Sequence, residues 1–200
     1  MRFITFLLIC FPIHLFSQLS PKAEAYISIQ DLKQSVLLVR LHTDEEVLKK
    51  MKKMKQYKML KAKKQEVLDK NKETYMAFST GYTFTDVYFF YAKSSKDIAD
   101  SNLKNIFVGA DLKIDTSINL PEGISFYIVD VGDIYFVAYG GHFEGIVVMD
   151  NNFVPLKKPF PYYVRKRSGF SLLRRTDMDM VLILQKKFED YLEESQNPRH

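Results

Sequence analysis

Residues 44–80 contain neither glycine nor proline, and this uninterrupted stretch constrains the fold more than any other part of the sequence. Glycine and proline are the residues that most often end a helix, so their absence predicts one long helix over about 44–79. Thr43 supplies a start signal as the cap, and Glu46 stands where its carboxylate can return the hydrogen bond. At 1.5 Å per residue such a helix would be roughly 50 Å long.

The first half of this predicted helix is strongly basic. Residues 49–64, KKMKKMKQYKMLKAKK, hold nine lysines and no acidic residue. The lysines fall on almost every side of a helical wheel, which predicts a solvated, protruding segment. Apolar residues of 57–78 recur at three-, four- and seven-residue steps, which predicts that the second half packs on the protein. A bend or helical hairpin near residue 60 remains an alternative, although no glycine or proline marks it.

Three short apolar runs predict buried strands at 35–41, 86–92 and 105–109. The long helix separates the first two, and a short helix capped by Ser94 separates the second and third. The resulting β-α-β-α-β order favours parallel pairing, because the first crossover has the length that a parallel connection needs.

The second half of the chain predicts an antiparallel meander. A turn at 131–133 separates the apolar segments 124–130 and 134–139, and Gly140-Gly141 turns the chain into 143–149. A further turn at 150–152 leads into FVPL.

A C-terminal amphipathic helix follows the meander. Thr176 and Asp179 give its start signal, and its apolar face extends from Val181 to Leu192. The predicted fold class is α/β or α+β, with a mixed sheet covered by helices.

Residues 1–17, MRFITFLLICFPIHLFS, have the pattern of a signal peptide. One cation, Arg2, precedes an apolar run that is shorter than the ~20 residues of a membrane span. Cleavage is expected after Ser17 or after Ala25, and the mature chain is expected to be periplasmic or secreted, without a transmembrane span. The only cysteine, Cys10, would leave with the signal, so no disulfide or thiolate chemistry is expected.

The remaining residues, 18–200, are expected to form a single globular domain. The sequence is 46% hydrophobic and 14% aromatic, and it has no internal repeat or flexible linker. Its charge is strongly polarised. Residues 49–64 carry +9, the acid-free segment 157–175 carries +7, and the rest of the chain from residue 18 on carries −12.

This polarity predicts a protein that acts by non-covalent binding to an anionic envelope component or an acidic protein. Aromatic residues within 157–175 also suit nucleic acid, but export argues against that partner, and no nucleic-acid-binding motif is present. The alternative explanation is that the lysines only keep a helix soluble. The sequence leaves the oligomeric state open. The expected binding residues are Lys49, Lys50, Lys52, Lys53, Lys55, Arg165, Lys166 and Arg167.

A small-anion-binding or hydrolytic site is the alternative function. His42 and Thr43 follow the first predicted strand, and Ser94 and Ser95 follow the second. Ligands often bind at the carboxyl ends of neighbouring parallel strands, where helix N-termini favour anions. The same serine and threonine also serve as ordinary helix caps, and catalysis is not the expected function.

His142 and Glu144 are the candidates for a metal. They stand two residues apart and would share one face of a strand. Metal sites need three or four ligands, so neither a metal nor another cofactor is expected. The sequence contains no glycine-rich phosphate loop, nucleophile elbow or zinc-protease helix.

Overall fold

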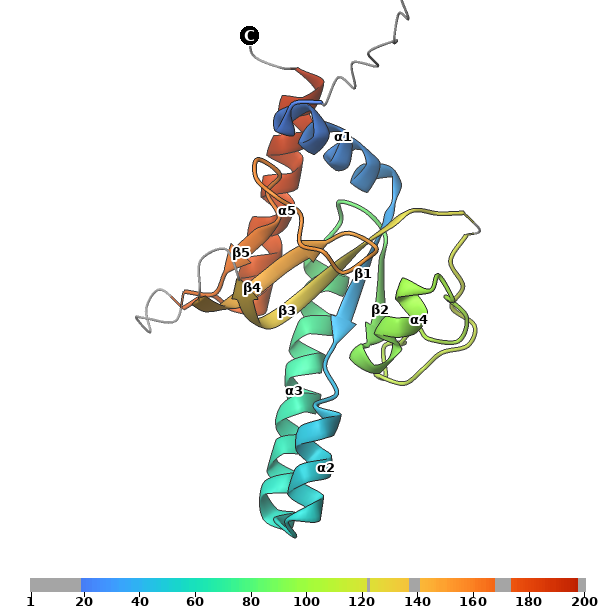
Figure 1. Cartoon of the computed structure of the whole chain (residues 1–200), viewed down its shortest axis with the longest axis vertical. Helices are drawn as coiled ribbons and strands as arrows, with labels where there is room; N and C mark the ends of the chain where they lie inside the picture. The colour runs from blue at the N-terminus through green and yellow to red at the C-terminus, as the bar shows by residue number, and fades with distance from the viewer. Residues whose placement is uncertain (1–18, 122, 137–140, 168–173, 198–200) are drawn as a thin grey trace, which may run out of the picture.

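The computed structural model describes residues 19–121, 123–136, 141–167 and 174–197 (Figure 1). Within these ranges the chain forms five α-helices, one 3₁₀ helix and five strands that make a single mixed sheet. This confirms the predicted fold class, in its α+β form. The elements are α1 (Pro21–Gln34), β1 (Val36–Leu41), α2 (Glu45–Lys53), α3 (Tyr57–Gly81), β2 (Val87–Tyr91), η1 (Ala92–Ser94), α4 (Ser95–Ala99), β3 (Phe126–Phe136), β4 (Gly141–Met149), β5 (Tyr163–Arg165) and α5 (Asp177–Gln196).

The sheet has the strand order β2-β1-β3-β4-β5. β1 pairs in parallel with both β2 and β3, whereas β3, β4 and β5 follow one another in antiparallel pairs. β1 is flanked by strands on both sides, and five of its six residues are buried. This position explains its nearly continuous apolar sequence.

Helices α1, α3 and α5 pack on one face of the sheet. Leu37, Val87 and Tyr127 lie side by side in the register and therefore point to the same face. The Tyr127 hydroxyl donates to Asp31 of α1 at 2.9 Å. On the same face, the ring of Phe89 in β2 contacts the ring of Tyr75 in α3, with 4.2 Å between centroids.

Helix α1 is an element that the sequence analysis does not predict. The Ser20 hydroxyl accepts from the Ala23 backbone N–H at 3.2 Å, and Pro21 occupies the first turn, where it needs no N–H partner. Ile29 and Leu32 are fully buried. The helix lies against α5 (Figure 1).

The prediction of a third parallel strand at 105–109 is wrong. Phe107 forms only an isolated antiparallel bridge with Phe90, and Val108 forms one with Ile114. β3 takes the third parallel place instead, next to β1. The second parallel neighbour of β1 therefore comes from further along the chain than the predicted strand at 105–109.

The predicted turn at 131–133 is also wrong, because β3 runs straight through it. Gly132 adopts φ +154°, a backbone conformation that favours glycine, while the strand pairing continues on both sides of it. The antiparallel meander is present as β3, β4 and β5. The predicted turn at Gly140-Gly141 lies partly outside the described residues, and FVPL contributes only a bridge between Pro155 and Met149.

The C-terminal helix is confirmed as α5, which carries the predicted capping box. The Thr176 hydroxyl accepts from the Asp179 N–H at 3.1 Å, and the Asp179 carboxylate accepts from the Thr176 N–H at 2.9 Å. Val181, Leu184 and Phe188 are fully buried. Among the described residues, none of the helices is long and apolar enough to span a bilayer.

Candidate functional site

The long glycine-free stretch folds into a helical hairpin. The prediction of one continuous helix over about 44–79 is therefore wrong, and the alternative of a hairpin is correct. α2 and α3 lie side by side and project together from the body of the protein (Figure 1). α2, every residue of which is described, buries no side chain. Leu48, Met51 and Leu60 are only half-buried. The α2 half of the hairpin thus has no buried core of its own.

The hairpin turn falls at residues 54–56. Lys55 adopts the left-handed conformation with φ 56°, and its N–H donates to the Lys52 carbonyl at 3.1 Å. The Gln56 N–H donates to the Met51 carbonyl at 3.0 Å. A left-handed residue bonded in this way ends a helix, and the position is usually occupied by glycine. Because a lysine occupies it here, the sequence carries no conventional break signal.

The base of the hairpin differs from the predicted cap. α2 begins after Asp44, which has φ 47°, and no side chain of the described residues caps it. Thr43 and Glu46 therefore do not form the expected capping box. An ion pair between Asp44 and Lys63, with 3.1 Å between Oδ2 and Nζ, joins the start of α2 to α3 instead. Glu66 also contacts Lys63, at 2.8 Å.

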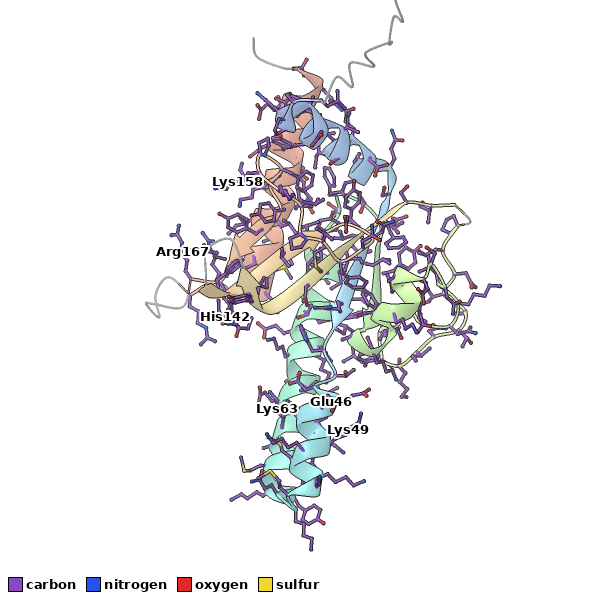
Figure 2. All side chains as sticks on the ribbon, viewed as in Figure 1. Glu46, Lys49, Lys63, His142, Lys158 and Arg167 are labelled. Atoms are coloured by element: carbon purple, nitrogen blue, oxygen red, sulfur yellow. The ribbon has the colours of Figure 1, made fainter. Side chains whose placement is uncertain are left out.

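Most of the lysines in 49–64 are exposed, and most have no carboxylate partner in the part of the chain that the structure describes. Only Lys63 is half-buried, and the other eight are exposed. Lys49 pairs with Glu46 at 2.8 Å, as Lys63 does with its two acids (Figure 2). For the remaining seven, no ion pair occurs with any residue that the structure describes. Their charge faces solvent.

Large apolar side chains are exposed at the turn of the hairpin, among these lysines. Met54 is 57% exposed, Tyr57 63% and Met59 55%. They stand in and beside the turn at 54–56, at the end of the hairpin furthest from the sheet (Figure 1). We call these three residues the apolar tip. Exposed apolar residues that cluster within a polar rim are typical of an interaction surface.

The second basic segment lies apart from the hairpin and is partly occupied by internal contacts. Lys158 and Arg167 lie at the side of the body, while Lys49 and Lys63 lie on the hairpin (Figure 2). The Arg165 guanidinium is 5.0 Å from the centroid of the Phe143 ring. The two basic segments therefore do not form one continuous surface.

Lys166, an expected binding residue, is directed into the protein. Its side chain is 11% exposed, and its Nζ lies 3.0 Å from Glu144 and 3.4 Å from buried Asp177. Asp177 also accepts from the Thr74 hydroxyl of α3 at 3.0 Å. Burial lowers the pKa of Lys166, but the two carboxylates outweigh burial and leave the pKa raised. Lys166 and Asp177 together link β4, α3 and α5.

His42 lies in a charged cluster at the carboxyl end of β1. Its Nε2 lies 2.8 Å from the Val131 carbonyl and 3.2 Å from Asp130 Oδ1, and Asp130 forms an ion pair with Arg40. The neighbouring Asp130 carboxylate raises the pKa of His42 despite the opposing effect of burial. Burial raises the pKa of Asp130, but His42 and Arg40 outweigh it, so that pKa is lowered.

The structure does not join His42 to the two serines of the alternative ligand site. Leu41 and Tyr91 are paired in the register, so the carboxyl ends of β1 and β2 do lie at one edge. Among the described residues, however, no hydrogen bond or ion pair links His42 or Thr43 to Ser94 or Ser95. The Ser95 hydroxyl donates to the Ala92 carbonyl at 2.7 Å, and Ser94 is buried.

The metal candidates are held by other contacts. Glu144 pairs with Lys166, and exposed His142 lies 3.6 Å from Asp133. No group of three or more metal-ligating side chains occurs within the described parts of the chain.

Sequence reasoning missed Asp130 as a partner of His42, although His42 directly follows β1 and Asp130 lies in the neighbouring parallel strand β3. The signal was available, since the apolar strand 124–130 ends with that aspartate. Finding it required the knowledge that β3 lies next to β1.

Comparisons of the chain with protein-family models, with curated proteins and with solved structures give no significant match.

Proposed function

We propose that this protein is exported and binds an anionic lipid surface, without catalysis, through the hairpin formed by α2 and α3. The observation that carries the proposal is the combination found at the end of the hairpin. An apolar tip of Met54, Tyr57 and Met59 is exposed among lysines that have no carboxylate partner in the described structure. The signal-like residues 1–17, which lie outside the described residues, support export.

The lysines supply the long-range part of the attraction. A lysine close to an anionic membrane surface contributes up to about 1 kcal/mol, and its effect falls off within a Debye length of roughly 8–10 Å. A body without a projecting segment would keep many of its charges beyond that distance. The hairpin brings seven unpaired lysines to one end of the molecule, where they can reach the surface together.

The apolar tip supplies the short-range part. A single basic helix lying flat would be a poor membrane anchor, because its lysines surround the wheel and leave no apolar face to insert. A hairpin that meets the surface end-on has no such requirement. Met54, Tyr57 and Met59 would enter the interface first, while lysine stems cover apolar surface and keep their ammonium groups at the phosphates.

Vesicle co-sedimentation across a salt series tests the proposal. The chain from residue 18 on would be mixed with vesicles of phosphatidylcholine alone or of phosphatidylcholine with phosphatidylglycerol. We expect binding only to the anionic vesicles and a decrease with salt. Replacing Lys49, Lys50, Lys52 and Lys53 with glutamine is expected to weaken binding by roughly 10- to 1,000-fold, since each lysine contributes up to about 1 kcal/mol.

A matched control removes the same charge from the other basic segment. Lys157, Lys158, Arg167 and Arg174 are all exposed, and changing them to glutamine lowers the net charge by the same amount. We expect this variant to retain most of the binding. Equal loss in the two variants would show that only net charge matters. No binding to anionic vesicles at low salt would overturn the lipid proposal, and an acidic protein would then be the partner to seek.

A further inference from the structure

A cavity of about 660 Å³ opens beside β2, on the opposite side of that strand from β1. The last turns of α3 supply Tyr75, Phe78 and Tyr82 to its lining, and β2 supplies Val87 and Phe89. Polar residues Ser79, Thr83, Thr85 and Asp86 complete the lining, so aromatic and polar groups share its walls. None of the hairpin lysines contributes to the lining, so this site is separate from the proposed lipid contact.

Tyr82 belongs to the wall of this cavity, but its hydroxyl is buried behind the wall. The residue is only 4% exposed, and its hydroxyl has no hydrogen-bond partner among the residues that the structure describes. Burial raises the pKa of Tyr82, and the nearby Thr85 hydroxyl opposes this shift only in part. A ligand in the cavity would therefore meet the aromatic side chains and the polar residues Thr83, Thr85 and Asp86, and would not meet this hydroxyl.

The outer edge of β2 provides a second set of unsatisfied groups. The Leu37 N–H of β1 donates to the Asp86 carbonyl at 2.9 Å, so the following bonds to β1 fall on Tyr88 and Phe90. The peptide groups of Val87 and Phe89 therefore point away from β1. The Phe89 carbonyl accepts from the Val108 N–H at 2.8 Å. Val87 has no backbone partner on this outer side within the described structure.

We propose that an extended peptide binds here by adding a short strand to β2. Its backbone would pair with the N–H and C=O of Val87, and a large apolar or aromatic side chain would enter the cavity. Asp86 is exposed and is the one charged residue in the described lining of the cavity. A basic side chain beside the apolar anchor would complement it. The bridge at Phe107 limits the added strand to the first part of β2.

Selection from a phage-displayed library of random peptides on the immobilised chain tests this inference. We expect enrichment of sequences that combine an apolar or aromatic residue with a neighbouring lysine or arginine. A synthetic peptide of the enriched sequence would then be titrated by fluorescence anisotropy. Failure to enrich such sequences, or binding that is unaffected by the variants below, would overturn the proposal.

Three variants separate the expected contacts. Val87→Pro removes the outward N–H and leaves the bonds to β1 in place, and proline is tolerated at the first residue of an edge strand. Val87→Ala is its control, because it trims the side chain and keeps the N–H. We expect roughly tenfold weaker binding for Val87→Pro and a smaller loss for Val87→Ala. Asp86→Asn removes the charge that a basic side chain of the peptide would meet, so it should weaken binding severalfold even if Val87→Pro fails to fold. Binding of a small molecule in place of a peptide would be insensitive to Val87→Pro and would overturn the proposal.

Discussion

His42 combines a local sequence signal with partners that are distant in the chain. Its position after β1 follows from the sequence, whereas Asp130 reaches it only because β3 pairs with β1. His42 also connects the end of β1 to α3. The Asn71 side-chain amide accepts from the His42 N–H at 3.0 Å and donates to the His42 carbonyl at 2.7 Å. Contacts between residues so far apart in sequence require the strand order to be known.

The raised pKa of His42 predicts a pH-dependent stability. A protonated His42 stabilises the fold fully below its unfolded pKa of about 6.5, and this contribution is lost as the pH rises through the folded value. Asp130, with a lowered pKa, contributes above about pH 4 and loses its contribution as the pH falls. Urea unfolding near pH 5.5 and near pH 8.5 should show a larger loss of stability in the wild type than in His42→Gln.

Two variants separate this explanation from a general effect of pH on stability. If His42→Gln and the wild type lose stability in parallel between those two pH values, protonation of His42 does not contribute to the folded state. Asp130→Asn should also reduce the pH dependence, because it removes the charge that favours the protonated imidazole.

Helix caps show where local sequence reasoning succeeds and where it fails. Thr176 and Asp179 form the predicted box, but the equivalent pattern at Thr43 and Glu46 does not, because the chain is still leaving β1 and α2 begins after Asp44. Thr176→Ala should therefore lower the free energy of unfolding by about 1 kcal/mol. Thr43→Ala should change it by only a few tenths. Equal losses in urea titrations would contradict the assignment of the caps.

The errors in the predicted strands and helix have related physical causes. Lys55 takes a left-handed conformation that usually belongs to glycine, whereas Gly132 lies within a strand instead of in a turn. In both places the surrounding structure overrides the local preference of the residue. The buried strand β1 and the amphipathic helix α5 were predictable, because their apolar patterns match their final burial. β2 was predictable as a strand, but as an edge strand it buries only two of its five residues.

The distribution of charge was predictable from the sequence, but its arrangement in space was not. The basic segments 49–64 and 157–175 lie in different parts of the protein (Figure 2). Lys166 resembles its basic neighbours in the sequence, yet it pairs with Glu144 and Asp177 inside the fold. Composition records how many charges a segment carries, and only the tertiary contacts determine which of them face solvent.

The hairpin should be separable from the rest of the protein. The ion pair between Asp44 and Lys63 marks its base, so a short Gly-Ser linker can replace residues 45–62. Since α2 buries none of its described residues, we expect the thermal unfolding midpoint to change by no more than about 4 °C, equivalent to roughly 1 kcal/mol. Binding to anionic vesicles should be lost. A fall in the midpoint of more than about 10 °C would show that the hairpin is part of the folding core.

Helix α3 belongs to both of the proposed binding sites. Its first turns stand in solvent beside the apolar tip, and Tyr75 and Phe78, near its other end, form a wall of the cavity beside β2. Its 25 residues make a rod of about 37 Å, with no proline and with its single glycine, Gly81, at the final position. Its buried residues all lie in its second half, from Asn71 to Gly81, so α3 is anchored in the body at one end and free at the other, as a cantilever is. A load on the free end should therefore leave the anchored wall of the cavity in place, and the two proposed sites should bind their ligands independently of each other.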